Sequence, residues 1–165
     1  MRSIELTFGD DGDAAILADW AELSNAGLES LAHHPGSSNR PHVTLAAGLH
    51  LADSPGLRAS LAGLPLRVRF GGLVVFGVGR RSFVLARQVV ASKKLLALHA
   101  AVHEAAPGAV ELTLPGHWTP HVTIARRLSA ESLALALPLL GALPPAEATA
   151  ARLWDGMTKQ LTPLT

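Results

Sequence analysis

One short stretch of sequence occurs twice in this chain, and this repeat constrains the fold more than any other feature. Residues 40–46 read Arg-Pro-His-Val-Thr-Leu-Ala, and 79 positions later residues 119–125 read Thr-Pro-His-Val-Thr-Ile-Ala. In an extended strand, side chains at positions i and i+2 point to the same face. Each copy therefore predicts a strand with one apolar face and one face that carries a histidine and a threonine.

The polar faces of the two strands predict a catalytic cleft. If the strands belong to pseudo-symmetric halves, then His42, Thr44, His121 and Thr123 converge on one site. Two imidazoles can supply a base and an acid near neutral pH, and two hydroxyls can donate to the non-bridging oxygens of a phosphate. Displacement at phosphorus suits this set best, and it demands no metal. An ancestral duplication that preserved a structural strand explains the apolar positions, but it explains the polar pairs poorly because such groups need partners.

Composition narrows the class of protein. With 165 residues, nearly half of them apolar, the chain is expected to form a single domain over 1–165, with approximate halves 1–88 and 89–165. The absence of cysteine excludes disulfides, cysteine metal sites and a thiol nucleophile. A net charge of +1 means that any nucleic-acid contact must come from a local patch. No secretory signal and no long apolar run is evident, so the expectation is a cytoplasmic monomer without a membrane span or an obligate protein partner.

Hydrophobic periodicity predicts the order strand, helix and motif strand in each half, which indicates an α+β protein with a duplicated lobe. A bulge is expected within the third strand at Gly71 and Gly72, and serines are expected to cap the two later helices. The predicted strands are 3–8, 41–48, 66–76, 82–90, the second motif strand and 147–154. The predicted helices are 14–23, 55–63, 92–106 and 129–140. Residues 32–40 are expected to form a loop, and residues 155–165 a weakly ordered tail.

The sequence leaves the roles of two further sets of residues open. Alternation in an unbroken strand places Arg127 on the His121 face, whereas Arg126 would need a bulge or the end of the strand to reach it. His99 and His103 have the i, i+4 spacing of a helical metal site, but no third ligand is evident. A solvated or half-buried helix face is therefore the preferred reading of that histidine pair.

The two motifs resemble the hallmark of the 2H phosphoesterase superfamily, a duplicated His-x-Thr/Ser-x-hydrophobic sequence, here at residues 42–45 and 121–124. Residues 4–8 with Trp20, and the segments before each motif, are similar to the bacterial 2′-5′ RNA ligase and 2′,3′-cyclic phosphodiesterase branch. The resemblance spans most of residues 3–155. It implies an α+β fold of two pseudo-symmetric lobes, each an antiparallel-rich sheet with helices packed outside, and an active-site cleft between them.

The resemblance also implies a reaction. It implies metal-independent, cofactor-free phosphoesterase chemistry on 2′,3′-cyclic phosphate ends of RNA or nucleotides, and 2′-5′ ligation when a ribose 5′-hydroxyl replaces water. The family pattern makes His121 the base and His42 the acid, while Thr44 and Thr123 hold the phosphate oxygens. The near symmetry of the motifs leaves the opposite order open. Rival functions for the same cleft are a non-catalytic RNA-binding module, a 3′ exonuclease and a small-metabolite phosphodiesterase.

Substrate contacts outside the motifs are expected by resemblance from two kinds of residue. Arg126, or Arg127 if the strand is unbroken, is the candidate phosphate contact. Phe76 or Phe83, in the predicted hairpin, is the candidate for stacking a base.

Overall fold

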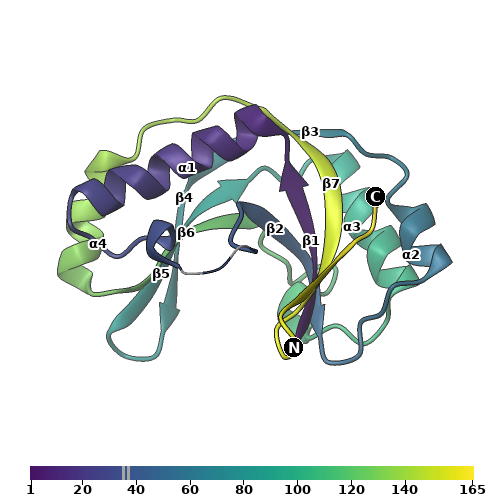
Figure 1. Ribbon diagram of the computed structural model, residues 1–165. Coiled ribbons are helices and arrows are strands. Elements are labelled where there is room, and N and C mark those ends of the chain that lie inside the picture. The colour runs from purple at the N-terminus through teal and green to yellow at the C-terminus, as the bar shows by residue number, and fades with distance from the viewer. Residues whose placement is uncertain (35, 37) are drawn as a thin grey trace.

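Two curled antiparallel sheets form the body of the protein (Figure 1). The computed structural model describes residues 1–165 except 35 and 37, so the loop expected at 32–40 lies partly outside the described residues. The first sheet has the order β2-β1-β7-β3, with β8 paired to β7. Its strands are β1 (Arg2–Phe8), β2 (His42–Gly48), β3 (Leu66–Val68), β7 (Ala146–Asp155) and β8 (Gln160–Pro163). The second sheet has the order β4-β5-β6, with strands β4 (Phe70–Val78), β5 (Ser82–Val89) and β6 (His121–Leu128).

The two motif strands, β2 and β6, are end strands of their sheets and contact each other at the junction between the sheets. Their back faces are buried: Val43, Leu45, Val122 and Ile124 are each at most 1% exposed. The alternation read from the sequence therefore holds over His-Val-Thr in both copies. Since each back face joins the hydrophobic core, the histidine and threonine side chains are left on the front face of each strand.

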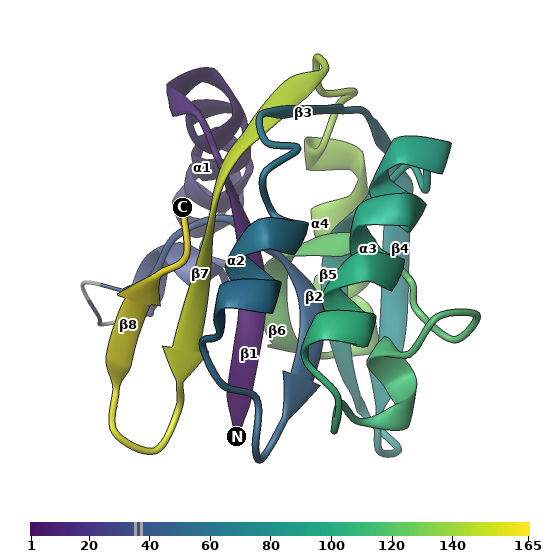
Figure 2. The ribbon, with the colours of Figure 1, turned by 90° about the vertical axis from the view of Figure 1, so that its right-hand side faces the viewer.

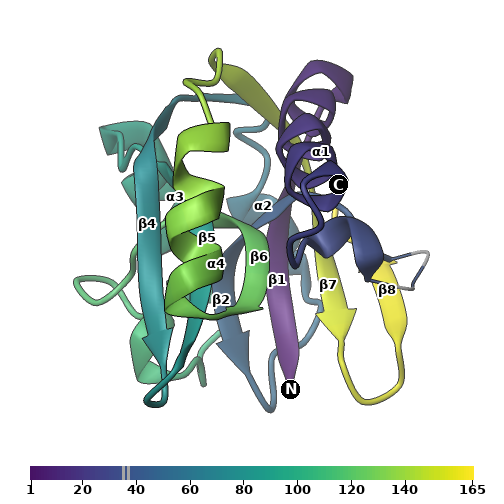
Figure 3. The same cartoon turned by 90° about the vertical axis from the view of Figure 1, so that its left-hand side faces the viewer.

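Helices cover the outer surfaces of both sheets. Helices α2 (Pro55–Ser60) and α3 (Lys93–Ala105) pack together beside the first sheet (Figure 2), and α4 (Ala130–Ala136) lies over β5 and β6 (Figure 3). Helix α1 (Asp10–Asn25) contacts both sheets through β1, β7 and β6, and thus ties the sheets together. Short 3₁₀ turns occur at η1 (Leu31–His33), η2 (Glu111–Thr113) and η3 (Leu137–Leu139). The predicted α+β class with helices outside two antiparallel sheets is confirmed.

The helix starts show how local sequence fixes these elements. The Ser92 hydroxyl accepts from Leu95 N at the start of α3, and the Ser129 hydroxyl accepts from Ser132 N at the start of α4, as predicted. Helix α1 begins at Asp10, four residues earlier than expected. Its first turn contains three aspartates, whose negative charge favours the N-terminal end of a helix.

The sheets do not follow the sequence halves 1–88 and 89–165. Strands β7 and β8 from the end of the chain complete the first sheet, whereas β4 and β5 from the first half belong to the second. The single strand expected at 66–76 is two strands, one in each sheet, and the expected irregularity occurs between Phe70 and Leu73. The tail expected to be weakly ordered contains β8, because β8 pairs with β7 from Arg152↔Pro163 to Asp155↔Gln160.

Candidate active site

The imidazole rings of His42 and His121 are held in the same way. The ring Nδ1 of His42 lies 2.7 Å from the Arg40 carbonyl oxygen, and that of His121 lies 2.7 Å from the Thr119 carbonyl oxygen. A carbonyl oxygen can only accept, so each Nδ1 carries the hydrogen. In the neutral ring, Nε2 is then the unprotonated nitrogen and can accept a proton.

Each motif strand is also anchored by a tryptophan. The indole Nε1 of Trp118 donates to the Thr44 carbonyl oxygen at 2.9 Å, and that of Trp20 donates to the Thr123 carbonyl oxygen at 3.1 Å. The two contacts come from different parts of the chain but occupy equivalent positions in the two motifs. The pseudo-symmetry of the site therefore extends beyond the repeated residues.

A bulge follows the threonine in each motif strand. Between β1 and β2 the register leaves Leu45 as the extra residue, and between β5 and β6 it leaves Ile124. A bulge reverses the alternation of the residues after it. For this reason Arg126, not Arg127, lines the cleft with His121. The alternative that placed Arg127 on the His121 face required an unbroken strand and is wrong: the backbone φ of Arg127 is 60°, and its side chain lines a hollow with Glu29 instead.

The histidines open onto two adjoining cavities. One, beside His42, has a volume of about 280 Å³, and the other, beside His121, has a volume of about 770 Å³. Thr44 and Arg126 line both cavities, so the two are parts of one cleft along the junction of the sheets. Thr123 lines the second cavity. The structure thus brings together the two histidines, the two threonines and Arg126.

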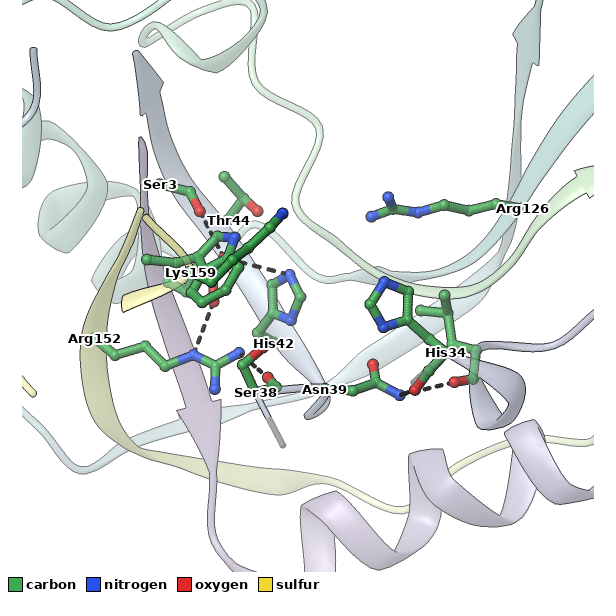
Figure 4. A pocket seen from close by; sticks show the side chains of 12 residues that line it. Ser3, His34, Ser38, Asn39, His42, Thr44, Arg126, Arg152 and Lys159 are labelled. Carbon is green, nitrogen blue, oxygen red and sulfur yellow. Dashed lines mark hydrogen bonds and ion pairs between the residues drawn. The ribbon is translucent and has the colours of Figure 1, made fainter. Parts of the chain in front are cut away.

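The wall beside His42 is polar and charged, as the side chains of Ser3, Arg152 and Lys159 show in Figure 4. A buried carboxylate, Glu5, places Oε1 3.7 Å from His42 Nε2. Ser3 Oγ donates to Glu5 Oε1 at 2.6 Å, and Arg152 Nε donates to Glu5 Oε2 at 2.8 Å. Glu5 therefore offers a charged His42 an ion-pair partner, while Arg152 balances the carboxylate when His42 is neutral.

The wall beside His121 is apolar. The Phe76 ring centroid lies 4.7 Å from that of His121, and the cavity there is lined by Val75, Val78, Leu112 and Trp118 among others. Burial lowers the pKa of His121, the positive charges of His42 and Arg126 lower it further, and the Thr119 carbonyl opposes this shift. A neutral His121 can take up a proton, which suits a general base.

Of the two phenylalanines considered for stacking, the structure brings one to the cleft. Phe76 lies against His121, whereas Phe83 packs against the hydrophobic core and pairs with Leu128 in the sheet. Phe83 lines neither cavity of the cleft among the described residues. Phe83 is therefore not placed to stack a substrate base.

The spaced histidines of α3 form a structural contact. His99 and His103 have Nε2 atoms 3.1 Å apart, His99 Nε2 lies 2.9 Å from the Thr113 carbonyl oxygen, and the His99 ring stacks on Trp118 at 3.9 Å. Burial and the adjacent His103 lower the pKa of His99. Within the described residues, no group of three or more potential ligands is arranged to hold a metal ion. The pair supports Trp118, which in turn holds the first motif strand.

Sequence reasoning missed several residues of the cleft, above all Glu5, Trp154 and Lys159. A signal for Glu5 was present, because its strand alternates and places Glu5 on one face with Ser3 and Thr7. No such signal existed for Trp154 and Lys159. Trp154 ends the strand predicted at 147–154, whereas Lys159 falls in the tail expected at 155–165, and the pairing of β7 with β8 brings both side chains to the cavity.

Two facing sheets with paired His-x-Thr strands at their junction define the architecture of a 2H phosphoesterase. A family model described as the 2′-5′ RNA ligase superfamily matches residues 12–154. The chain belongs to the 2′-5′ RNA ligase superfamily, whose members are 2H phosphoesterases. No curated protein sequence matches this chain.

Solved structures show the same fold. Usb1 from Kluyveromyces marxianus is 16% identical, with a TM-score of 0.54, and the match covers 99% of this chain and 96% of that one. Its complex with uridine monophosphate is 15% identical, with a TM-score of 0.55 and the same coverage. The protein TT0787 from Thermus thermophilus is 20% identical, with a TM-score of 0.54, and the match covers 99% of this chain and 94% of that one. At these identities the likeness concerns the fold alone.

Among the described residues, no helix has both the length and the apolar character needed to cross a membrane.

Proposed function

We propose that this protein opens 2′,3′-cyclic phosphates at the ends of RNA or nucleotides. The observation that carries the proposal is the shared geometry of His42 and His121, which have the same Nδ1 anchor and open onto one cleft. Membership of the superfamily supports phosphoesterase activity in general. The nucleotide substrate is supported by the Usb1 structure that contains uridine monophosphate.

His121 acts as the base in the proposed reaction and His42 as the acid. His121 takes a proton from water as the water oxygen bonds to phosphorus. The bond from phosphorus to one ribose oxygen breaks, and His42 gives its proton to that oxygen, leaving a phosphomonoester. The lowered pKa of His121 supports its role as base, and the Glu5 carboxylate beside His42 supports the opposite role.

The phosphate itself is bound between the two motif strands. Thr44 and Thr123 donate to the non-bridging oxygens, and the Arg126 guanidinium offsets their negative charge. Such groups stabilise the transition state because negative charge concentrates on these oxygens during displacement. They lie on fixed strands, so little reorganisation is needed when the reaction occurs.

The test is a panel of nucleoside 2′,3′-cyclic phosphates and cyclic-phosphate RNA in ¹⁸O-labelled water, with products assigned by mass spectrometry. We expect a phosphomonoester that contains one ¹⁸O atom, and a kcat about 10³-fold lower in His42→Ala and in His121→Ala. Turnover by either variant at the wild-type rate would disprove the assignment. Binding of cyclic-phosphate RNA without any product would indicate a non-catalytic RNA-binding module. Turnover restricted to linear RNA or to small diesters would indicate a 3′ exonuclease or a metabolite phosphodiesterase.

The cavity beside His121 favours a second candidate reaction, 2′-5′ ligation. A volume of about 770 Å³ with an apolar lining exceeds what an attacking water needs. A ribose 5′-hydroxyl attacking from this side would place its nucleoside against Phe76. The experiment adds an RNA with a 5′-hydroxyl to the cyclic-phosphate RNA and looks for a joined product that resists nucleases specific for 3′-5′ links. A cyclic-phosphate RNA that is only hydrolysed under these conditions would exclude ligation.

A further inference from the structure

The cavity beside His42 extends beyond the residues that the proposed reaction uses. It reaches Trp154 at the end of β7 and Lys159 in the turn before β8. Figure 4 shows Lys159 on the same side of the cavity as His42 and Thr44, with Arg126 on the other side. A cationic side chain thus lies in the cleft away from the reacting phosphate.

The position of Lys159 is built into the hairpin. Its backbone has a φ of 59°, an unusual value for a residue other than glycine, and its N–H donates to the Asp155 carbonyl oxygen at 2.8 Å. The Asp155 carboxylate accepts from Met157 N at 2.9 Å and from Arg2 Nε at 3.0 Å, which fixes the turn. This conformation belongs to the tight turn between β7 and β8, and it fixes the direction in which the Lys159 side chain leaves the backbone.

The Lys159 side chain is also restrained, and its charge is available. Its Nζ lies 5.8 Å from the centroid of the Trp154 ring, which is a cation–π contact. Of the neighbouring cations, Arg152 is engaged by Glu5 and by the Ser38 carbonyl oxygen. No carboxylate lies within 4.0 Å of Lys159 in the part of the chain that the structure describes. The ammonium group can therefore bind an anion without giving up an ion pair.

We propose that Lys159 binds a second phosphate of the substrate, the one on the 5′ carbon of the ribose whose cyclic phosphate is opened. This inference rests on the proposed function. Because His42 serves the leaving ribose oxygen, that ribose must lie on the His42 side of the cleft. Its 5′ substituent then enters the cavity that Lys159 and Trp154 line. The preferred substrate is therefore a 5′-phosphorylated 2′,3′-cyclic phosphate, either a mononucleotide with a 5′-phosphate or the end of an RNA chain.

The kinetic test compares three substrates that share a base. These are a nucleoside 2′,3′-cyclic phosphate, its 5′-phosphorylated form, and a dinucleotide that ends in the same cyclic phosphate. We expect the wild type to have a kcat/KM about 10-fold higher for substrates with the second phosphate, and Lys159→Met to bring the ratio of kcat/KM between the substrates with and without that phosphate close to one. The matched control is Lys94→Met, which removes an exposed lysine of α3 away from the cleft. The two phosphorylated substrates distinguish a terminal phosphate from an internucleotide one.

A binding test separates failure of this subsite from failure of the proposed function. It measures Kd for a nucleoside 3′-monophosphate and for the corresponding 3′,5′-bisphosphate, with wild type and with Lys159→Met. We expect about 10-fold tighter binding of the bisphosphate by the wild type alone. If the wild type binds the bisphosphate more tightly but turns over no cyclic phosphate, the subsite is supported and the proposed reaction is refuted. Equal affinities in the wild type, or an equal loss for both ligands in Lys159→Met, would overturn the subsite.

Discussion

The two motif strands carry the same residues, but the strands beside them differ. In the first sheet, Glu5 lies opposite Thr44, and Arg152 lies opposite Glu5 on the next strand. In the second sheet, Ala86 lies opposite Thr123, and Val74 is the next residue in that row. A charged row in one sheet thus corresponds to an apolar row in the other.

The difference between the charged row and the apolar row shows how a duplicated motif can acquire two distinct roles. Two histidines in identical surroundings would have the same affinity for a proton. Neither could then be assigned as the base or as the acid. Here burial lowers the pKa of His121, whose ring contacts Phe76, whereas His42 lies 3.7 Å from a carboxylate oxygen of Glu5. Environments that separate the protonation states of two like groups are a known basis for assigning acid and base.

The largest expected effect comes from removing the histidines. His42→Ala and His121→Ala should each lower kcat for a cyclic phosphate by about 10³-fold, because each removes a proton transfer. The two variants should differ in kcat for a nucleoside 3′-(4-nitrophenyl phosphate), because its nitrophenolate leaving group needs no proton. There the 2′-hydroxyl attacks, so His42 on the ribose side becomes the base, and His121 becomes dispensable. Steady-state release of nitrophenolate measures this difference.

The contrast between the histidine variants has clear controls. Both variants should keep the far-UV circular dichroism and the cooperative urea unfolding of the wild type. Retention of nitrophenyl turnover by His42→Ala, with its loss in His121→Ala, would reverse the roles of the two strands. Equal loss in both variants would mean that the two environments do not differ in function.

The threonines should show a smaller and more symmetrical effect. Thr44→Val and Thr123→Val keep the shape of the side chain but remove a hydroxyl donor to a charged phosphate oxygen. Each should lower kcat/KM about 10- to 100-fold, the range for a hydrogen bond to a charged group. Thr149→Val, at an exposed position of β7, is the matched control and should leave kcat/KM unchanged. A loss confined to one motif would show that a single strand holds the phosphate.

Much of the fold could be predicted because strands and helix caps leave local signals. The motif strands were recognised from a period of two, and Ser92 and Ser129 from their positions before helical stretches. The assignment of strands to sheets could not be predicted, since the chain crosses from β3 to β4 within a continuous strand-like run. Long-range pairing leaves no local trace in such a segment.

The candidate site was predictable to the same extent. The four motif side chains follow from the repeat, but the choice between Arg126 and Arg127 depends on one extra residue, Ile124. A bulge has no distinct composition, so counting along an ideal strand favours Arg127, and only the resemblance to the family favours Arg126. The choice between Phe76 and Phe83 depends on which face of a hairpin meets the core, and both faces of that hairpin carry apolar residues.

The apolar wall around His121 can be tested through the pH dependence of kcat. The base must be neutral, and a lowered pKa keeps it neutral to lower pH, so the acidic limb of the profile should lie below that of an ordinary histidine. Phe76→Ala admits water to the ring and weakens the desolvation that lowers the pKa of His121. The acidic limb should therefore move to higher pH. Phe76→Leu, which keeps an apolar cover, should move it less.

The pH measurement needs conditions in which chemistry limits the rate, established by a rate that does not change with solvent viscosity. An acidic limb that stays in place in Phe76→Ala would mean that the phenylalanine does not control the protonation of His121. A limb that moves to lower pH would contradict the proposed cause of the shift.

The smallest expected effects concern the tryptophan anchors, which are the most symmetrical part of the site. Trp20→Phe and Trp118→Phe each leave a motif carbonyl oxygen without its indole donor. Trp20 is 2% exposed, so water cannot replace the lost donor, and we expect a loss of about 2 kcal/mol in the free energy of unfolding. Trp118 is half-buried, so we expect water to replace its lost indole donor in part and the loss to be about 1 kcal/mol.

Urea unfolding measures these two losses, with an unchanged m value as evidence that the transition remains two-state. Trp154→Phe is the control, because it removes the same atoms from a half-buried tryptophan whose indole makes no hydrogen bond to the described residues. A larger loss for Trp118→Phe than for Trp20→Phe would locate the firmer anchor on the first motif strand. In that case the contacts of His99 and His103 behind Trp118 would stabilise β2 through that tryptophan. The two motif strands would then differ in the strength of their tryptophan anchors as well as in the charge of the neighbouring residues.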